Sequence, residues 1–265
     1  MAQPRVLVLR AAGVNCDRET AYAFELAGAL VETLHVNQFT RGSRRLREFQ
    51  LLAIPGGFTY GDDVSAGRIL SNEMRALMGD QLREFIRDGG LMLGICNGFQ
   101  ALVKAGLLPG CIGDSNASTL PPQSATLAEN RSGRFQCQWV KLRVNEKGAP
   151  PFLAGMDGVV IDVPIAHGEG RFSAPEDVCR HMLESNQVAL QYCGPSGELD
   201  DSYNVNGSAM SAAGVSGYEG RILGLMPHPE RHVHGTQHPR WTRNGLRPEG
   251  DGLRIFRNAV GYLRS

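Results

Sequence analysis

An apolar run that ends in a glycine-rich turn constrains this chain more than any other part of its sequence. The run Leu91–Ile95 is typical of a buried strand, and the pattern after it predicts a helix over Asn97–Lys104. Cys96 lies between the two, and the flanking Gly94 and Gly98 allow a sharp turn that exposes the sulfur. The positive end of the helix dipole favours the thiolate, which is the reactive form. The pattern therefore predicts a nucleophile at Cys96, with an inert buried thiol as the alternative.

A base for this nucleophile is predicted near the other end of the chain. His228 and Glu230 follow a strand predicted at 221–226. Residues two apart point the same way in extended backbone, so the Glu230 carboxylate is expected beside the His228 imidazole. Pro227 and Pro229 restrict the backbone on both sides and oppose a helix. Taken alone, the same residues would also suit a surface loop with no catalytic task.

A second glycine turn supplies candidate donors for a developing negative charge. Gly56 and Gly57 follow a strand predicted at 51–55, and they leave backbone N–H groups bare. Acyl transfer to a thiolate builds charge on a carbonyl oxygen, which backbone N–H groups stabilise. We expect the N–H groups of Gly57 and Asn97 to do so, because Asn97 follows the nucleophile. An ordinary strand-to-loop turn would carry the same residues.

The order of the predicted elements indicates an α/β fold. Strands are expected at 5–11, 30–36, 51–55 and 91–95, and helices at 18–28, 66–88 and 97–104. This alternation predicts an open, mostly parallel sheet with helices on both faces and a site at the carboxyl ends of the strands. A mixed or antiparallel extension is expected from strand-like runs at 136–144, 159–165 and 188–191 with little helix between them. The strand at 221–226 returns to the main sheet, a helix at 252–263 closes the chain, and 113–134 is expected to be a loop.

Length and composition indicate one large domain, residues 1–265, with a full hydrophobic core. The 27 basic and 27 acidic residues cancel, which argues against a nucleic-acid partner. No apolar run is long enough to cross a membrane, and the N-terminus leads into a strand without a signal peptide. The six cysteines fit no zinc template, and a chain of this kind does not need a disulfide framework. We expect a cytoplasmic protein with free thiols and no metal.

The three turns together resemble those of the class I, triad-type glutamine amidotransferases. The resemblance rests on Pro55-Gly56-Gly57, Gly94-Ile95-Cys96-Asn97-Gly98-Phe99-Gln100 and His228-Pro229-Glu230. Five further segments, in order along nearly the whole chain, resemble the glutaminase subunits of phosphoribosylformylglycinamidine synthases: 13–19, 58–63, 166–172, 206–208 and 226–231. The chain departs from that pattern at Val205, where many members carry proline, and in the long segment 232–250.

The resemblance implies roles for individual residues. Cys96 is expected to attack the side-chain amide of glutamine, His228 to transfer the proton, and Glu230 to orient the imidazole. The expected oxyanion and glutamine-binding residues are Gly57, Phe58, Asn97 and Gln100. Residues expected near the site or a partner are His167, Glu169 and Arg171.

The resemblance also implies a partner. The sequence has no Gly-x-x-x-x-Gly-Lys-Ser/Thr loop for nucleotide phosphates, so no cofactor is expected on this chain. ATP and Mg²⁺ are expected on a partner synthetase that converts formylglycinamide ribonucleotide to formylglycinamidine ribonucleotide in purine biosynthesis, together with a small accessory subunit. The segments 167–172 and 232–250 are the candidate contact surfaces, although both could be ordinary loops.

Two other functions remain open at this point. A stand-alone hydrolase of γ-glutamyl or peptide bonds could use the same scaffold, and it would be fully active without a partner. A non-catalytic binding module is the third reading. The intact set Cys96, His228 and Glu230 argues against it, because a retired enzyme has no chemical need for all three.

Overall fold

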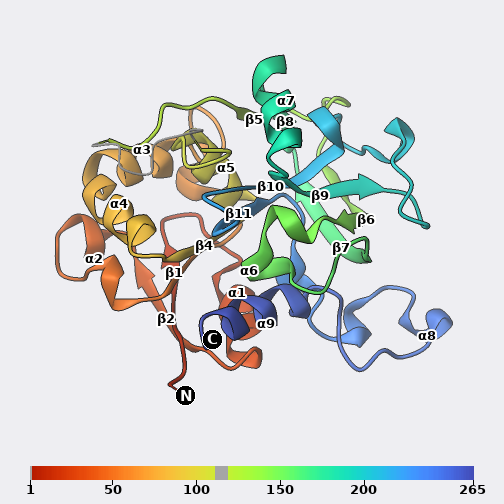
Figure 1. The fold of residues 1–265 in the computed structure, drawn as a ribbon, viewed down its shortest axis with the longest axis horizontal. Coiled ribbons are helices and arrows are strands. Elements are labelled where there is room, and N and C mark those ends of the chain that lie inside the picture. The colour runs from red at the N-terminus through yellow and green to blue at the C-terminus, as the bar shows by residue number, and fades with distance from the viewer. Residues whose placement is uncertain (1, 111–118) are drawn as a thin grey trace.

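The computed structural model describes residues 2–110 and 119–265. In chain order its strands are β1 (Arg5–Arg10), β2 (Leu30–His35), β3 (Leu51–Ile54), β4 (Leu91–Ile95), β5 (Thr126–Ala128), β6 (Gln136–Val144), β7 (Val160–His167), β8 (Arg171–Ser173), β9 (Val188–Cys193), β10 (Ala212–Gly217) and β11 (Ile222–Leu225). Within the described residues, nine of them form one sheet in the order β2-β1-β3-β4-β11-β10-β9-β6-β7 (Figure 1).

The first five strands of this order are parallel to one another. Strands β3, β4 and β11 are buried along their whole length, as expected for a parallel sheet covered on both faces. The α-helices of the described chain are α1 (Asp17–Leu26), α2 (Asn37–Thr40), α3 (Arg68–Leu77), α4 (Gly79–Arg87), α5 (Asn97–Lys104), α6 (Pro150–Leu153), α7 (Glu176–Glu184), α8 (Trp241–Asn244) and α9 (Leu253–Tyr262).

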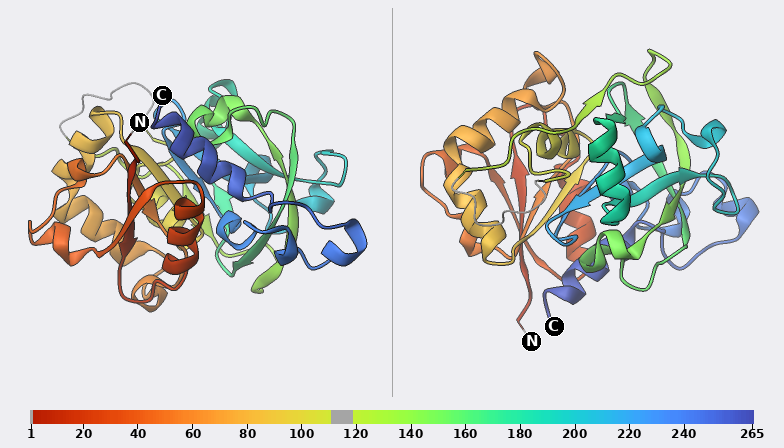
Figure 2. Two further views of the ribbon diagram at one scale, coloured as in Figure 1. Left: turned by 90° about the horizontal axis from the view of Figure 1, so that it is seen from below. Right: turned by 45° about the horizontal axis from the view of Figure 1, so that its top comes forward.

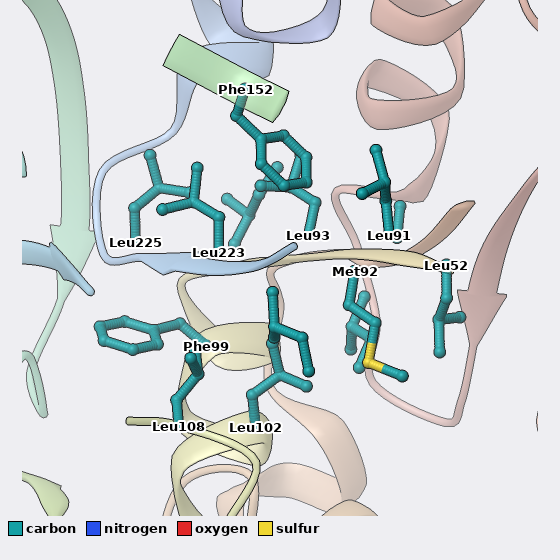
Figure 3. Close-up of a cluster of buried hydrophobic side chains, with 14 of the residues drawn as sticks. Leu52, Leu91, Met92, Leu93, Phe99, Leu102, Leu108, Phe152, Leu223 and Leu225 are labelled. Atoms are coloured by element: carbon teal, nitrogen blue, oxygen red, sulfur yellow. The ribbon is translucent and has the colours of Figure 1, made fainter. Parts of the chain in front are cut away.

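Helices cover both faces of the parallel half, which confirms the predicted architecture. Helices α1, α6 and α9 lie on one face and α3, α4 and α5 on the other (Figure 2). Figure 3 shows the two layers at β4 and β11: Phe99 and Leu102 of α5 pack on one side, and Phe152 of α6 lies on the other, above Leu93 and Leu223. The core is therefore two apolar layers separated by the sheet.

The second half of the sheet is antiparallel. Strand β10 pairs with β11 and β9, and β6 pairs with β9 and β7, all in antiparallel register. Strands β5 and β8 form a separate two-stranded sheet. The predicted mixed or antiparallel extension is confirmed.

Four local features differ from the prediction. The single helix expected at 66–88 is two helices, because Met78 leaves helical geometry at φ −120° and Gly79 follows it. Strand β10 was not predicted, and helix α7 lies where little helix was expected. The loop expected at 113–134 contains β5, and its residues up to 118 lie outside the described part of the chain.

In the part of the chain that the structure describes, no helix is both long enough and apolar enough to cross a membrane.

The register of the central strands brings the three predicted turns together. Ile54 of β3 lies beside Gly94 of β4, and Ile95 of β4 lies beside Leu225 of β11. These strands are parallel, so their carboxyl ends meet at one edge of the sheet. The turns that follow β3, β4 and β11 therefore surround a common site.

Candidate active site

Cys96 lies on the sharp strand-to-helix turn that its neighbours predicted. Its backbone has φ 51° and ψ −105°, a conformation that residues other than glycine rarely adopt. A Cβ on Gly94 would lie 2.8 Å from the Gly98 oxygen, and one on Gly98 would lie 1.9 Å from the Ile54 oxygen. Both glycines are therefore required by close backbone contact, and the turn holds the sulfur at the N-terminus of α5.

His228 and Glu230 form a buried pair. Nδ1 of His228 lies 2.6 Å from Oε1 of Glu230, and both side chains are almost fully buried. The predicted contact is present, but the backbone expected to produce it is not. Pro229–Arg231 is a short 3₁₀ helix with proline at its first position, where the missing N–H costs no hydrogen bond.

The surroundings of His228 favour its protonated form. Burial alone lowers the pKa of His228, but the Glu230 carboxylate and the Cys96 sulfur raise it, and the net result is well above the usual value. Within the described residues, the buried Nε2 atom has no hydrogen-bond partner. It is therefore free to exchange a proton with a ligand beside it.

Gly56 is the point at which the side chains of His228, Cys16 and Cys96 meet. A Cβ on this residue would lie 2.8 Å from Cε1 of His228, 3.1 Å from Sγ of Cys16 and 3.4 Å from Cβ of Cys96. Sγ of Cys96 lies 3.8 Å from the Ala166 carbonyl oxygen. A side chain at position 56 would push these groups apart, so only glycine fits.

Cys16 and Arg231 also belong to this cluster, and the sequence reasoning assigned them no role. Sγ of Cys16 lies 4.0 Å from Nδ1 of His228 and accepts a 3.0 Å hydrogen bond from Nη2 of Arg231. Donor atoms of Cys16, His228 and Glu230 lie within 4.8 Å of one another, as metal ligands can. The Arg231 cation on the sulfur opposes a metal ion there. Both residues lie in segments that carried the resemblance, which was the only available signal.

The two expected oxyanion donors lie at the ends of neighbouring strands. The Gly57 N–H donates to no described residue, and Asn97, as the first residue of α5, has no helical acceptor. The Phe58 N–H instead donates to the Gly13 oxygen at 2.9 Å. Gly57 has φ 145°, and a Cβ there would lie 2.7 Å from the same Gly13 oxygen. The turns after β3 and β4 thus offer one free N–H each.

A cavity of about 160 Å³ opens beside Cys96. Its walls include most of the residues expected there: Gly57, Phe58, Gln100, His167 and Glu169. Asn97 lies behind the wall and is fully buried. Arg171 does not line the cavity; its side chain donates to the Glu129 oxygen at 2.9 Å. The segment 232–250 contributes no lining residue either.

Two of the lining side chains already have partners within the protein. Oε1 of Gln100 accepts from Nδ2 of Asn97 at 3.0 Å, and Nε2 of Gln100 donates to the Glu169 oxygen at 2.5 Å. Nδ1 of His167 lies 3.0 Å from Oδ1 of Asn130. Burial and the nearby His228 lower the pKa of His167 to about 4, so this imidazole stays neutral.

The cavity wall also carries acidic charge. Burial raises the pKa of Asp62 and Glu169 raises it further, although a hydrogen bond from Asn97 acts in the other direction. Nζ of the buried Lys104 lies 3.8 Å from Oε2 of Glu169. Burial lowers the pKa of Lys104, and Glu169 partly offsets this. These groups suit a small zwitterionic ligand better than an apolar one.

Known proteins with similar sequences show to which family this chain belongs. The model of the CobB/CobQ-like glutamine amidotransferase domain matches residues 3–263. The phosphoribosylformylglycinamidine synthase subunit PurQ of Dehalococcoides mccartyi is 47% identical over 100% of this chain and 99% of its own length. The protein of the same name from Methanococcus maripaludis is 38% identical over 98% of this chain and 97% of its own length.

Solved structures agree. A chain in the structure of PurLQS from Thermotoga maritima superposes with a TM-score of 0.74 and 31% identity, over 99% of this chain and 100% of that one. A glutamine amidotransferase from the same organism, at 17% identity and a TM-score of 0.55, shares the fold over the full length of both chains. The chain therefore belongs to the glutamine amidotransferase family, and within it to the family of the phosphoribosylformylglycinamidine synthase subunit PurQ.

Proposed function

We propose that this chain hydrolyses glutamine to glutamate and ammonia, and that the ammonia serves a partner synthetase in purine biosynthesis. The observation that carries the proposal is that Cys96 lines the cavity and that His228, paired with the buried Glu230, lies behind it, both side chains meeting at Gly56. Family membership supports the same reaction. The named roles below are our proposal for this chain.

In the first half of the reaction, the Cys96 thiolate attacks the side-chain amide carbon of glutamine. A carbon–sulfur bond forms, and the carbonyl oxygen becomes an oxyanion that accepts from the N–H groups of Gly57 and Asn97. Collapse of this intermediate breaks the carbon–nitrogen bond. The His228 imidazolium gives its proton to the leaving nitrogen, so ammonia departs and a γ-glutamyl thioester remains.

In the second half, water cleaves the thioester. The neutral His228 takes a proton from the water as it attacks, and the same oxyanion site holds the second intermediate. The carbon–sulfur bond then breaks and releases glutamate. Cys96 returns as a thiolate beside an imidazolium, and Glu230 stabilises that cation through the 2.6 Å contact.

We further propose that the mouth of the cavity docks on an ATP-dependent synthetase, with a small accessory subunit in the same complex. Phe58 and Phe135 line the cavity but are 49% and 55% exposed, and Val64 nearby is 89% exposed. Apolar side chains around a polar site suit a covered surface. A covered mouth would also deliver ammonia before water converts it to ammonium. ATP and Mg²⁺ are assigned to the synthetase.

The segment 167–172 is our candidate for signalling to that partner, because His167 and Glu169 belong to the cavity wall. The segment 232–250 is a second candidate contact. We also propose a cytoplasmic location, which is supported by the absence of disulfide bonds among the five described cysteines.

Coupling to the partner tests this function. The release of glutamate from glutamine is measured with the purified chain alone, with the synthetase, and with the synthetase plus its nucleotide and ribonucleotide. We expect the rate to rise in that order, because loading the synthetase favours the productive arrangement of the site. Full activity of the chain alone, unchanged by any addition, would instead identify a stand-alone hydrolase.

A further inference from the structure

The side chain of Asn97 uses all of its hydrogen-bonding capacity within the protein. Asn97 directly follows the strand-to-helix turn at Cys96 and is fully buried. Its Oδ1 atom accepts from the Thr59 N–H at 3.1 Å and from the Thr59 hydroxyl at 2.6 Å. Its Nδ2 atom donates to Asp62 at 2.9 Å and to Gln100 at 3.0 Å. An amide offers two donors and two acceptor positions, so no capacity remains for a ligand.

Three of these four bonds reach one strained segment. Tyr60, Asp62 and Val64 all have positive φ, at 55°, 56° and 70°, although none of them is glycine. Residues in this region persist only where surrounding contacts hold them. The segment directly follows Gly57, whose N–H is one of the two proposed oxyanion donors. The Asn97 side chain therefore holds a loop that would otherwise relax.

The opposite side of the same loop is held by backbone contacts. The Phe58 N–H donates to Gly13 at 2.9 Å, and the Tyr60 N–H donates to Ala12 at 2.8 Å. The loop thus lies between the 12–16 turn and helix α5. Asn97 connects it to α5, the element that carries the other proposed donor.

We propose that the Asn97 side chain is a positioning group that fixes the distance between the Gly57 N–H and its own backbone N–H. One residue then supplies an oxyanion donor through its backbone and places the second donor through its side chain. The inference rests on the proposed glutaminase function. It explains why Asn97, which follows Cys96, is hydrogen-bonded to Thr59 and Asp62, which follow the Pro-Gly-Gly turn.

The replacement Asn97→Asp tests the proposal with almost no change of shape. The new carboxylate can still accept from Thr59, but it donates nothing to Asp62 or Gln100 and places two carboxylates side by side. We expect kcat for glutamine hydrolysis to fall about 10- to 100-fold, on the scale of a weakened oxyanion donor, with KM within about threefold. Rates are measured in the complex with the synthetase.

A pH profile separates positioning from a general loss of structure. One carboxyl of the new pair takes up a proton more readily and becomes a donor again. The charged groups of Glu169 and Lys104 lie near the same pair, so neither residue is substituted in any of the variants. Relative to the wild type, the kcat of Asn97→Asp should therefore recover as the pH is lowered from about 8 to about 6.

Exchanging the two groups should restore activity. In Asn97→Asp combined with Asp62→Asn, the amide at 62 donates to the carboxylate at 97 and the like-charge contact disappears. We expect kcat to recover by about tenfold over Asn97→Asp, less than fully because Gln100 loses its donor. Asp63→Asn is the matched control, since Asp63 is exposed and lies outside the cavity wall; its kinetics should equal those of the wild type.

The outcomes distinguish the inference from the function on which it rests. Three outcomes with an active wild type contradict the inference alone. In the first, Asn97→Asp leaves kcat unchanged; in the second, it changes only KM. In the third, the kcat of the double variant is no higher than the product of the effects of its two single changes. A wild type that releases no ammonia contradicts both. If Asn97→Asp does not fold, Thr59→Val removes only the hydroxyl donor to Asn97 and should lower kcat by about 3- to 10-fold at constant KM; wild-type kcat in that variant would overturn the proposal.

Discussion

At the scale of single residues, the site works by placing one charge beside another. The buried Glu230 carboxylate holds a proton on His228, and that imidazolium lies where it can face the Cys96 thiolate. Arg231 approaches the same carboxylate, with Nε 4.0 Å from Oε1, and contacts Cys16. Each group depends on its neighbour, so the effects of removing two of them should not add.

Glu230→Gln should be mild for folding and severe for rate. The amide keeps the shape, but it no longer raises the pKa of His228, so imidazolium is lost at lower pH than in the wild type. We expect kcat/KM to fall about tenfold or more, and its alkaline limb to move to lower pH, against near-total loss in His228→Ala. A kinetic pH profile measures both effects. Glu184→Gln on the exposed face of α7 is the control; wild-type behaviour of Glu230→Gln would remove Glu230 from the mechanism.

At the scale of elements, the elbow between β4 and α5 exists because two backbones touch. The Ile54 oxygen of β3 lies where a side chain on Gly98 would begin. Glycine at position 98 therefore lets helix α5 pack close to the sheet, and any larger residue there would hold the helix farther away. The same closeness brings the N-terminus of α5 and the Gly57 turn together, and Cys96 and Gly57 line one cavity.

Gly98→Ala should destabilise the protein even though alanine favours a helix. The clash at 1.9 Å forces backbone to move, which we expect to lower the free energy of unfolding by about 1–3 kcal/mol. Gly261→Ala in α9 is the matched control, because its Cβ would meet nothing within 4 Å. That change should be neutral or stabilising by up to about 1 kcal/mol. Thermal or denaturant unfolding reports both, and equal stability of the two variants would contradict the close-approach argument.

At the scale of the whole molecule, the cavity accounts for the proposed release of ammonia from glutamine but not for its use. The described chain places a complete amide-cleaving set beside an opening rimmed by exposed aromatic side chains. The proposed acceptor of the ammonia lies on another chain. The function is therefore best tested by separating ammonia production from ammonia use.

Cys96→Ala should abolish glutamine-dependent product formation in the complex but leave synthesis from added ammonium intact. The variant lacks the nucleophile, whereas the acceptor site on the synthetase is unchanged. Product is assayed with glutamine and, separately, with ammonium. Cys179→Ala is the control, because this thiol lies on α7 and no residue of α7 lines the cavity. Persistent glutamine hydrolysis in Cys96→Ala would reject the nucleophile, and loss of the ammonium reaction would show a wider defect.

The sequence by itself determined those parts of the molecule in which the local residue pattern favours the same structure that the folded protein adopts. Apolar runs bounded by glycine indicated β3, β4 and β11, and the parallel arrangement of β3 and β4 followed from the alternation of strands with helices. The turns after β3 and β4, and with them Gly57 and Cys96, could be placed at one edge for that reason, whereas the parallel pairing of β11 with β4 that brings His228 to the same edge was shown by the structure. Motif spacing indicated the His228–Glu230 contact, although the backbone that makes it is a 3₁₀ turn.

Only the tertiary structure decided what depends on partners far away in the chain. Strand β10, composed of alanine, glycine, valine and serine, has weak strand propensity and forms because β9 and β11 pair with its two edges. The contact of Cys16 with Arg231, and the bonds of Asn97 to Thr59 and Asp62, join residues 35 or more positions apart. Hydrogen bonds of this kind leave no period in a sequence. They arise because the sheet brings three turns to one edge, where each buried polar group must find a partner.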